Sequence, residues 1–567
     1  MMLLWIVLLV ILTGFILVDV EGFLAVPRRY GDNLHNSQAL LHAKGVYIND
    51  KEIKSYDSFG FSPHLRIGGF TVPTHVVFGT NAMEHGVNLL EEISSEALVV
   101  HGWNAARLDT LLWELEPRGF RLNFLSIASS IPTLEDVAEI VNTLERSKMR
   151  IVIAVGGGYI IDAVKLAASV MAHNVTGISI ASPNTPVIMC SIPLLPAGGS
   201  EISSYSAISG GVNMDAMEHN QIKRLTFKHY IPTISPDLCI VHPVSLYRAN
   251  MADVNERILN LIATCFEIII DGDASYMSEL LVQDALRTLI VILDKAVTAY
   301  DTRLIDRQAH FSKYFDFTMN DVDENDPDDP HGHHRQTQFF RRYGHTFDEG
   351  TIIDICRLSV SVNSAKVGGS VTITPMQFLA DCLLATDRDL RETDGNQYTS
   401  TYTSFIARMF PRYALVLLDW IEDGTNEARQ ESPEKAYARV SINKLAETFG
   451  ASKFFAIEDD GKNDGTSEQE DNSCRTFRSQ MIKLIQIVDR IIDRSDRIGP
   501  EPTGISLDDM IVEDFGQTSI DRYEMSERDA YELNMKMRAV CGEGCIGSRL
   551  DPLNIRKMLN EILHVPK

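Results

Sequence analysis

From residue 66 onward, short apolar runs alternate with segments whose apolar residues recur at helical spacing. The runs at 75–79, 97–102, 121–128 and 151–158 have the length and the Val, Ile, Leu and Phe content of buried strands. The segments between them place their apolar residues on one face of a helix. Strands and helices in alternation predict a parallel sheet covered by helices on both faces, and we expect an α/β domain over residues 66–245.

One of these helices carries its own start signal. Thr133 precedes the segment TLEDVAEIVNTLERSK, and Asp136 follows Thr133 by three residues. A hydroxyl at the first position and a carboxylate three residues later can each accept a hydrogen bond from the other residue's backbone N–H. We therefore expect Thr133 to cap the helix N-terminus.

The pattern changes after about residue 246, where strand-like runs end. Long stretches of helical periodicity follow at 257–270, 277–297, 376–385 and 477–494, and they predict an all-α domain over residues 246–567. Two acidic tracts, near 318–336 and 456–474, interrupt this pattern and are almost free of apolar residues. Because such tracts cannot bury a core, we expect both to be exposed insertion loops.

The N-terminus differs from the rest of the chain. Residues 3–18 form an uninterrupted apolar run, which is longer than most signal-peptide cores and slightly short for a bilayer span. We expect residues 1–23 to be a signal peptide or membrane anchor, followed by a polar lead-in over 24–65. This predicts entry into the secretory pathway, an endomembrane or a plastid, with cleavage left open.

Composition narrows the class of protein. The 567 residues suggest two or three domains, and 45% hydrophobic content is typical of a globular protein. The net charge of −25 argues against nucleic acid as a partner, since phosphate binding requires clustered Lys and Arg. Eight cysteines in a chain of this length do not make a disulfide framework.

The stretch IVIAVGGGYIIDAVKLAAS at 151–169 carries the first chemical signal. Three glycines end a predicted strand and a helix begins directly after them. Because glycines have no side chains, a phosphate can approach the N–H groups at the helix N-terminus closely here. A tight turn would use the same glycines, and in that alternative Asp162 would be a capping carboxylate and Lys165 an exposed helix cation.

The spacing GGGYIIDAVK resembles the GGGSxxDxxK signature of the iron-type (group III) alcohol dehydrogenases and glycerol dehydrogenases, relatives of dehydroquinate synthase. The stretch IPLLPAGGSEIS also resembles that family's PTTAGTGSE segment, and 547–563 resembles its last helix. The resemblance implies a dehydroquinate synthase-like two-domain fold, with a Rossmann-like first domain that binds NAD or NADP. It places the cofactor at Gly156, Gly157, Gly158, Asp162, Lys165, Ser200 and Glu201.

In the dehydrogenase branch, one Asp and three His hold a divalent metal such as Fe or Zn. Matching the segments puts Asn260 at the Asp position and Thr264 at the first His, while His345 keeps the third and Gly368 occupies the fourth. An amide and a hydroxyl are poor ligands beside carboxylates and imidazoles. The resemblance therefore predicts a metal site that is altered in this chain.

Three functions stay open. The resemblance favours an NAD(P)-dependent oxidoreductase acting on a small alcohol, aldehyde or polyol, with homo-oligomers as in the family. A catalytically silent nucleotide-binding relative would also explain the changed ligand positions. A cyclase like dehydroquinate synthase is the third possibility, since Asp253 and the GHTF segment at His345 resemble synthase motifs, although Glu256 and Glu349 replace a basic residue and a His there.

Overall fold

The protein is described by a computed structural model. The described residues are 70, 72–102, 109–127, 133–172, 187–194, 198–209, 228–243, 246, 251–270, 274–310, 347–368, 373–394, 402–422, 432–452, 454–455, 469–491, 525–541 and 549–563. The predicted signal or anchor, the polar lead-in and the first acidic tract lie outside them. Within the described ranges, every helix is too short or too polar to span a bilayer.

The first part of the chain forms a six-stranded parallel sheet in the order β1-β8-β5-β4-β2-β3. Its strands are β1 (His75–Phe78), β2 (Glu96–Gly102), β3 (Arg121–Ile127), β4 (Ile151–Gly156), β5 (Ile188–Pro193) and β8 (Leu238–Val241). The four predicted strands are β1 to β4, each within two residues of its predicted ends. The parallel sheet expected from the alternating pattern is therefore confirmed.

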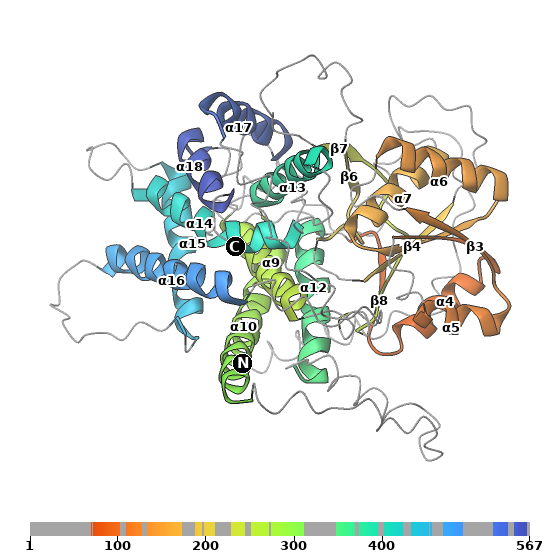
Figure 1. The fold of residues 1–567 in the computed structure, drawn as a ribbon, viewed down its shortest axis with the longest axis horizontal. Coiled ribbons are helices and arrows are strands. Elements are labelled where there is room, and N and C mark those ends of the chain that lie inside the picture. Colours follow the sequence, from red (N-terminus) through yellow and green to blue (C-terminus); the bar gives the residue numbers. More distant parts are fainter. Residues whose placement is uncertain are drawn as a thin grey trace, which may run out of the picture. The chain divides into compact units, whose positions relative to one another are not determined.

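Helices cover both faces of this sheet (Figure 1). The helices α4 (Ala82–Glu91) and α5 (Asp109–Leu115) pack on one face, and α6 (Leu134–Ser147) and α7 (Gly158–Met171) pack on the other. Successive side chains of β4 point to opposite faces of the sheet. Ile153 packs with α4 and α5, and Ala154 packs with α6 and α7. Because the strands are buried on both faces of the sheet, their sequences are continuous apolar runs.

The N-terminus of α6 has the predicted cap. Thr133 Oγ1 accepts a hydrogen bond from the Asp136 backbone N–H at 3.4 Å, and Asp136 Oδ2 accepts one from the Thr133 N–H at 2.7 Å. Both bonds of the capping box are present. The prediction from sequence spacing is confirmed.

A second, two-stranded sheet was not predicted from the sequence. The strands β6 (Tyr205–Ser209) and β7 (Lys228–Pro232) pair antiparallel, with Tyr205 opposite Pro232. Both strands are short and carry polar residues, so they lack the apolar runs that mark the main sheet. The helix α7 packs against β6, which brings this small sheet beside the glycine-rich turn.

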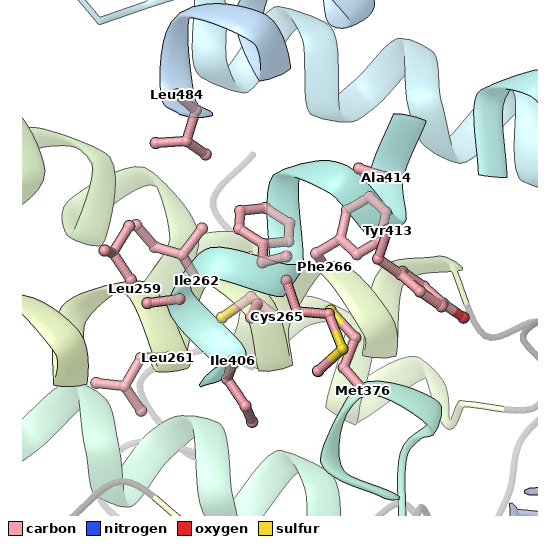
Figure 2. Close-up of a cluster of buried hydrophobic side chains, with 14 of the residues drawn as sticks. Leu259, Leu261, Ile262, Cys265, Phe266, Met376, Ile406, Tyr413, Ala414 and Leu484 are labelled. Atoms are coloured by element: carbon pink, nitrogen blue, oxygen red, sulfur yellow. The ribbon is translucent and has the colours of Figure 1, made fainter. Parts of the chain in front are cut away.

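The second part of the chain is helical, as expected. Its described helices are α9 (Met251–Ile270), α10 (Tyr276–His310), α12 (Glu349–Gly368), α13 (Pro375–Asp394), α14 (Tyr402–Glu422), α15 (Pro433–Gly450), α16 (Gln469–Ile491), α17 (Glu527–Cys541) and α18 (Pro552–Leu563). Phe266 of α9 lies at the centre of their core, with ring centroids 5.2 Å from Phe410 and 6.2 Å from Phe477. Figure 2 shows Phe266 among buried residues of α9, α13, α14 and α16. An α/β part followed by an all-α part confirms the predicted fold class.

One boundary in this part was predicted wrongly. The helix α16 begins at Gln469, within the tract expected to be a loop as far as residue 474. An acidic residue such as Glu470 or Asp471 is favourable in the first turn of a helix, because a negative charge there is attracted to the positive end of the helix dipole. An acidic stretch can therefore be a helix start as well as a loop.

Candidate functional site

The glycine-rich turn joins β4 to α7 and leaves the helix N-terminus open. Gly157 is exposed, a Cβ added there would meet no heavy atom within 4 Å, and no side chain caps the helix. Unpaired N–H groups and the positive end of a fourteen-residue helix therefore face outward at this point. This is the geometry that accepts a phosphate group, and it fits the pyrophosphate of a dinucleotide.

The neighbouring glycine is needed for close packing. A Cβ on Gly158 would lie 2.9 Å from Ser200 Oγ, and a Cβ on Gly156 would lie 2.8 Å from Ile160 Cγ1. Gly199, next to Ser200, has a φ of +81°, which favours glycine. The segment around Ser200 is thus brought against the first turn of α7.

Asp162 and Lys165 are both buried, and they fasten α7 to the small sheet. Lys165 Nζ lies 2.9 Å from Asp162 Oδ1 and donates to Ser203 Oγ at 2.9 Å and to the Tyr205 carbonyl. Asp162 Oδ2 accepts a hydrogen bond from the Ala207 N–H at 3.1 Å. Burial lowers the pKa of the Lys165 ammonium, and Asp162 opposes that shift.

The alternative of an exposed helix cation at position 165 is therefore wrong, since the Lys165 side chain is fully buried. Helical periodicity alone could not reveal this, because the partners of Lys165 lie about 40 residues later in the chain. A role of Asp162 and Lys165 in cofactor binding stays a prediction. Their bonds hold β6 in position beside the glycine-rich turn.

Glu201 links the same region to the helical part. Its carboxylate is buried and accepts a hydrogen bond at 2.8 Å from Asn363 Nδ2 on α12. Burial raises the pKa of the Glu201 carboxyl, while this hydrogen bond and Lys165 act in the opposite direction. Among the described residues, the buried Asn363 Oδ1 has no hydrogen-bond partner. It is an acceptor that a ligand donor, such as an amide of a cofactor, could satisfy.

Three polar side chains that the sequence did not single out meet close by. Gln377 of α13 donates Nε2–H to the Tyr205 hydroxyl at 2.9 Å, and Lys366 Nζ of α12 donates to that hydroxyl at 3.4 Å. Lys366 also donates to Gln377 Oε1, and the Tyr205 hydroxyl donates to the same oxygen at 3.2 Å. All three side chains are buried. Because Lys366 and Gln377 stand within regular helical patterns, no sequence signal separates them from ordinary helix residues.

Buried carboxylates surround this group. Glu267 Oε1 accepts the Met376 N–H at 2.7 Å, and Asp381 Oδ2 accepts the Tyr230 hydroxyl at 2.8 Å. Burial lowers the pKa of the Lys366 ammonium to about 8, and the charges of Glu267, Asp381 and Glu201 oppose this shift. The site therefore combines a buried cation with a buried phenol.

The structure describes the surroundings of three of the four positions matched to the family's metal ligands. Asn260 is 1% exposed, and Thr264 Oγ1 donates at 2.9 Å to the Asn260 carbonyl of its own helix. A side chain at Gly368 would meet the Phe70 ring at 2.5 Å. His345 lies outside the described residues. Over the described ranges, no three His, Cys, Asp or Glu side chains are placed to hold one ion.

The positions that resembled a synthase also have defined surroundings. Glu256 is fully buried and accepts a hydrogen bond from Thr403 Oγ1 at 2.9 Å. Asp253 is half-buried on the same helix, and Glu349 is exposed at the start of α12. The positive charge of Arg257, the next residue along α9, acts on both Asp253 and Glu256.

Comparison with known proteins finds matches to the dehydrogenases that the sequence motifs resemble. Residues 73–243 match the family model described as iron-containing alcohol dehydrogenase. NADH-dependent butanol dehydrogenase B of Clostridium acetobutylicum is 22% identical over 230 residues, which are 39% of this chain. The match covers 56% of that relative, so the chain spans little more than half of its length.

Solved structures share the fold over most of the chain. An iron-containing alcohol dehydrogenase of Thermotoga maritima superposes with a TM-score of 0.52 and 13% identity, over 88% of this chain and 99% of that one. An archaeal alcohol dehydrogenase from a Red Sea brine pool, bound to the ligand NZQ, gives 0.54 and 11% identity over 87% and 98%. At these identities the likeness shows the fold. Residues 73–243 are thus similar to the iron-containing alcohol dehydrogenase family, and most of the chain shares the fold of these solved structures.

Proposed function

We propose that this protein is an NAD(P)-dependent oxidoreductase that interconverts a small alcohol or polyol and its aldehyde or ketone. The observation that carries the proposal is the open N-terminus of α7 at Gly157, with Ser200 packed against Gly158. Such a turn accepts a pyrophosphate through backbone N–H groups and the helix dipole. The relatives named above, one of them an NADH-dependent butanol dehydrogenase, support the choice of reaction.

A nicotinamide cofactor would supply the hydride in this reaction. The chain's own part is to hold the pyrophosphate at Gly157 and Gly158 and to orient the rest of the cofactor toward the buried polar side chains. Asn363 Oδ1 provides a buried acceptor on that side, and Glu201 fixes the Asn363 amide through its hydrogen bond. Holding the cofactor and the substrate in a fixed orientation removes much of the entropic barrier to their reaction.

We further propose that the metal site is altered, so that the protein holds no divalent metal tightly. Asn260 and Thr264 supply only neutral oxygen donors, and Thr264 directs its hydroxyl to a backbone carbonyl. Neutral donors of this kind do not replace a carboxylate and an imidazole for Fe or Zn. His345, the family-like residue that is kept, cannot hold a metal tightly alone.

The experiment uses the full-length protein, purified without added metal. Fe, Zn, Mn and Ni are quantified on the same sample that is titrated with NADH and NADPH by fluorescence. Short-chain aldehydes, ketones and polyols are then screened for cofactor-dependent turnover, with and without a chelator. We expect binding of one nicotinamide cofactor, substoichiometric metal and turnover that survives the chelator.

The outcomes separate the alternatives. Nicotinamide binding without turnover of any substrate would favour the silent nucleotide-binding relative. Stoichiometric metal that disappears in a His345→Ala variant would contradict the altered metal site while leaving the dehydrogenase intact. Failure to bind either cofactor would contradict the proposed function itself.

A further inference from the structure

The Tyr205, Gln377 and Lys366 side chains come from three separate elements, β6, α13 and α12, and meet inside the protein. Gln377 and Lys366 both donate to the Tyr205 hydroxyl, at 2.9 Å and 3.4 Å. The Tyr205 hydroxyl donates to Gln377 Oε1 at 3.2 Å, an oxygen that Lys366 also contacts and that a substrate oxygen would replace as acceptor. Lys366 is only 4% exposed. A buried ammonium costs several kcal/mol unless charges and hydrogen bonds compensate it. Its presence in a core therefore requires either a structural or a chemical reason.

A short series of contacts connects the group of Tyr205, Gln377 and Lys366 to the glycine-rich turn. Ser200 packs on Gly158, and a Cβ on the adjacent Gly199 would lie 3.4 Å from Asn363 Oδ1. Asn363 stands three residues before Lys366 on α12, so both side chains share one face of that helix. The turn proposed to hold the cofactor phosphates is thus linked to the Lys366 face of α12 through Gly199 and Asn363.

Burial lowers the pKa of the Lys366 ammonium, and nearby negative charges oppose that shift. They belong to Glu267 of α9, Asp381 of α13 and Glu201 after β5. Glu267 stands on α9 three residues after Thr264, on the helix that carries both substituted metal positions. The Lys366 ammonium is therefore close enough to α9, the helix of both substituted positions, to interact with Glu267.

We propose that the Tyr205 hydroxyl, held in position by Gln377 and Lys366, binds the substrate oxygen and donates a proton to it in place of a divalent metal. The inference rests on the proposed function, since it names the groups that act on the substrate. Gln377 and Lys366 orient the Tyr205 hydroxyl, and the ammonium stabilises negative charge that develops on the substrate oxygen. Tyr205 is the catalytic residue of the group, and Lys366 and Gln377 are positioning residues.

The proton and the electrons are accounted for in the direction of reduction. The carbonyl carbon accepts a hydride, with its electron pair, from a reduced nicotinamide, and the carbonyl π pair moves to oxygen. The Tyr205 O–H bond breaks and its proton passes to that oxygen, giving the alcohol. Lys366 returns a proton to the phenolate oxygen and regains one from water. Alcohol oxidation is the reverse sequence.

The test measures binding of butyramide, an unreactive carbonyl compound, to the chelator-treated full-length protein saturated with NADH. Butyramide offers a carbonyl oxygen to the Tyr205 hydroxyl but cannot be reduced, so NADH fluorescence reports binding without turnover. Tyr205→Phe and Lys366→Met remove the hydroxyl and the charge. Tyr437→Phe is the matched control, since it removes a tyrosine hydroxyl that bonds to the Ile269 carbonyl.

We expect butyramide to bind without metal, and both variants to weaken its binding about tenfold or more while the NADH affinity stays within about twofold. Where wild-type turnover is measured, Tyr205→Phe lowers kcat roughly 100-fold. Lys366→Arg, which keeps the charge, retains part of the binding. Thermal unfolding identifies a variant that has not folded, and Tyr205→Phe keeps the test available if Lys366→Met fails to fold.

Butyramide binding that needs added Zn or Fe, that survives both substitutions, or that does not occur at all would overturn the inference. Each of these results leaves NADH binding intact, and the proposed nucleotide site with it. Absence of NADH binding in the wild-type protein would instead overturn the proposed function and this inference together. The two failures are therefore distinguishable.

Discussion

Lys165 Nζ lies 2.9 Å from Asp162 Oδ1, in an ion pair buried between α7 and β6. The pair joins the helix that begins at the glycine-rich turn to the strand that begins at Tyr205. Two functional segments that are 40 residues apart are thus held at a fixed distance. A salt bridge at this point specifies the geometry of the site.

Removing one partner should destabilise the protein strongly. Lys165→Met leaves Asp162 buried without its cation, and breaking a buried pair in this way costs about 3–5 kcal/mol. The double variant Asp162→Asn with Lys165→Met should lose less than the sum of the single variants, because no uncompensated charge remains. Urea unfolding measures all three, and a loss below about 1 kcal/mol in the single variant would contradict the role of the pair.

The contact of Gly158 with Ser200 leads to a second prediction. Gly158→Ala introduces a Cβ 2.9 Å from Ser200 Oγ, and we expect a loss of about 1–3 kcal/mol from overpacking. Adding Ser200→Ala removes the Oγ and should recover part of that loss. Gly157→Ala, where a Cβ meets nothing within 4 Å, is the matched control. Equal losses at positions 157 and 158 would show that the contact with Ser200 is not the cause.

The capping box of α6 leads to a prediction that does not depend on the candidate functional site. Thr133→Ala removes the Oγ1 acceptor of the Asp136 N–H, and a lost N-cap costs about 1 kcal/mol. Thr143→Ala is the control, because the partly exposed Thr143 hydroxyl donates to the Glu139 carbonyl of its own helix. Urea unfolding compares the two variants. A larger loss for Thr143→Ala would contradict the cap.

The buried Lys366 makes stability depend on pH in a definite direction. Its pKa of about 8 in the folded protein is below the value of about 10.4 for an unfolded lysine. Between these values the unfolded chain binds more protons, so the contribution of Lys366 to the free energy of unfolding rises with pH and is lost as pH falls through 8. Lys366→Met lacks that contribution.

The difference in unfolding free energy between the wild-type protein and Lys366→Met should therefore increase in favour of the wild type from pH 8 to pH 10. Tyr and Cys residues that titrate in the same range are present in both proteins and cancel in the difference. Urea unfolding at three pH values measures it. A difference that stays constant or falls would mean that the Lys366 pKa is not lowered.

The sequence predicted the parts of this fold that depend on local pattern. The strands β1 to β4 and the cap at Thr133 follow from apolar runs and from three-residue spacing, and both are visible in a single segment. The small sheet at Tyr205 could not be predicted, because short polar strands are stabilised by pairing and by contacts with α7. Propensity carries no information of that kind.

The same distinction holds for the site. The glycine-rich turn is local and was predicted with its matched segment at Ser200. Lys366 and Gln377 owe their significance to contacts with Tyr205 across more than 160 positions. A lysine within a helical pattern is ordinarily exposed, and only tertiary packing shows that this one is buried.

The decisive measurement is NADH and NADPH binding to Gly157→Asp, by fluorescence titration. A carboxylate at the open N-terminus of α7 would occupy the place of the pyrophosphate and repel it, and nothing within 4 Å prevents the Cβ from fitting. Met535→Asp, at a 72% exposed position on α17, adds the same charge elsewhere. We expect Gly157→Asp to weaken binding by about tenfold or more, or about 1.4 kcal/mol, and Met535→Asp to leave it unchanged. Equal affinity for all three proteins would contradict a nucleotide site at this turn.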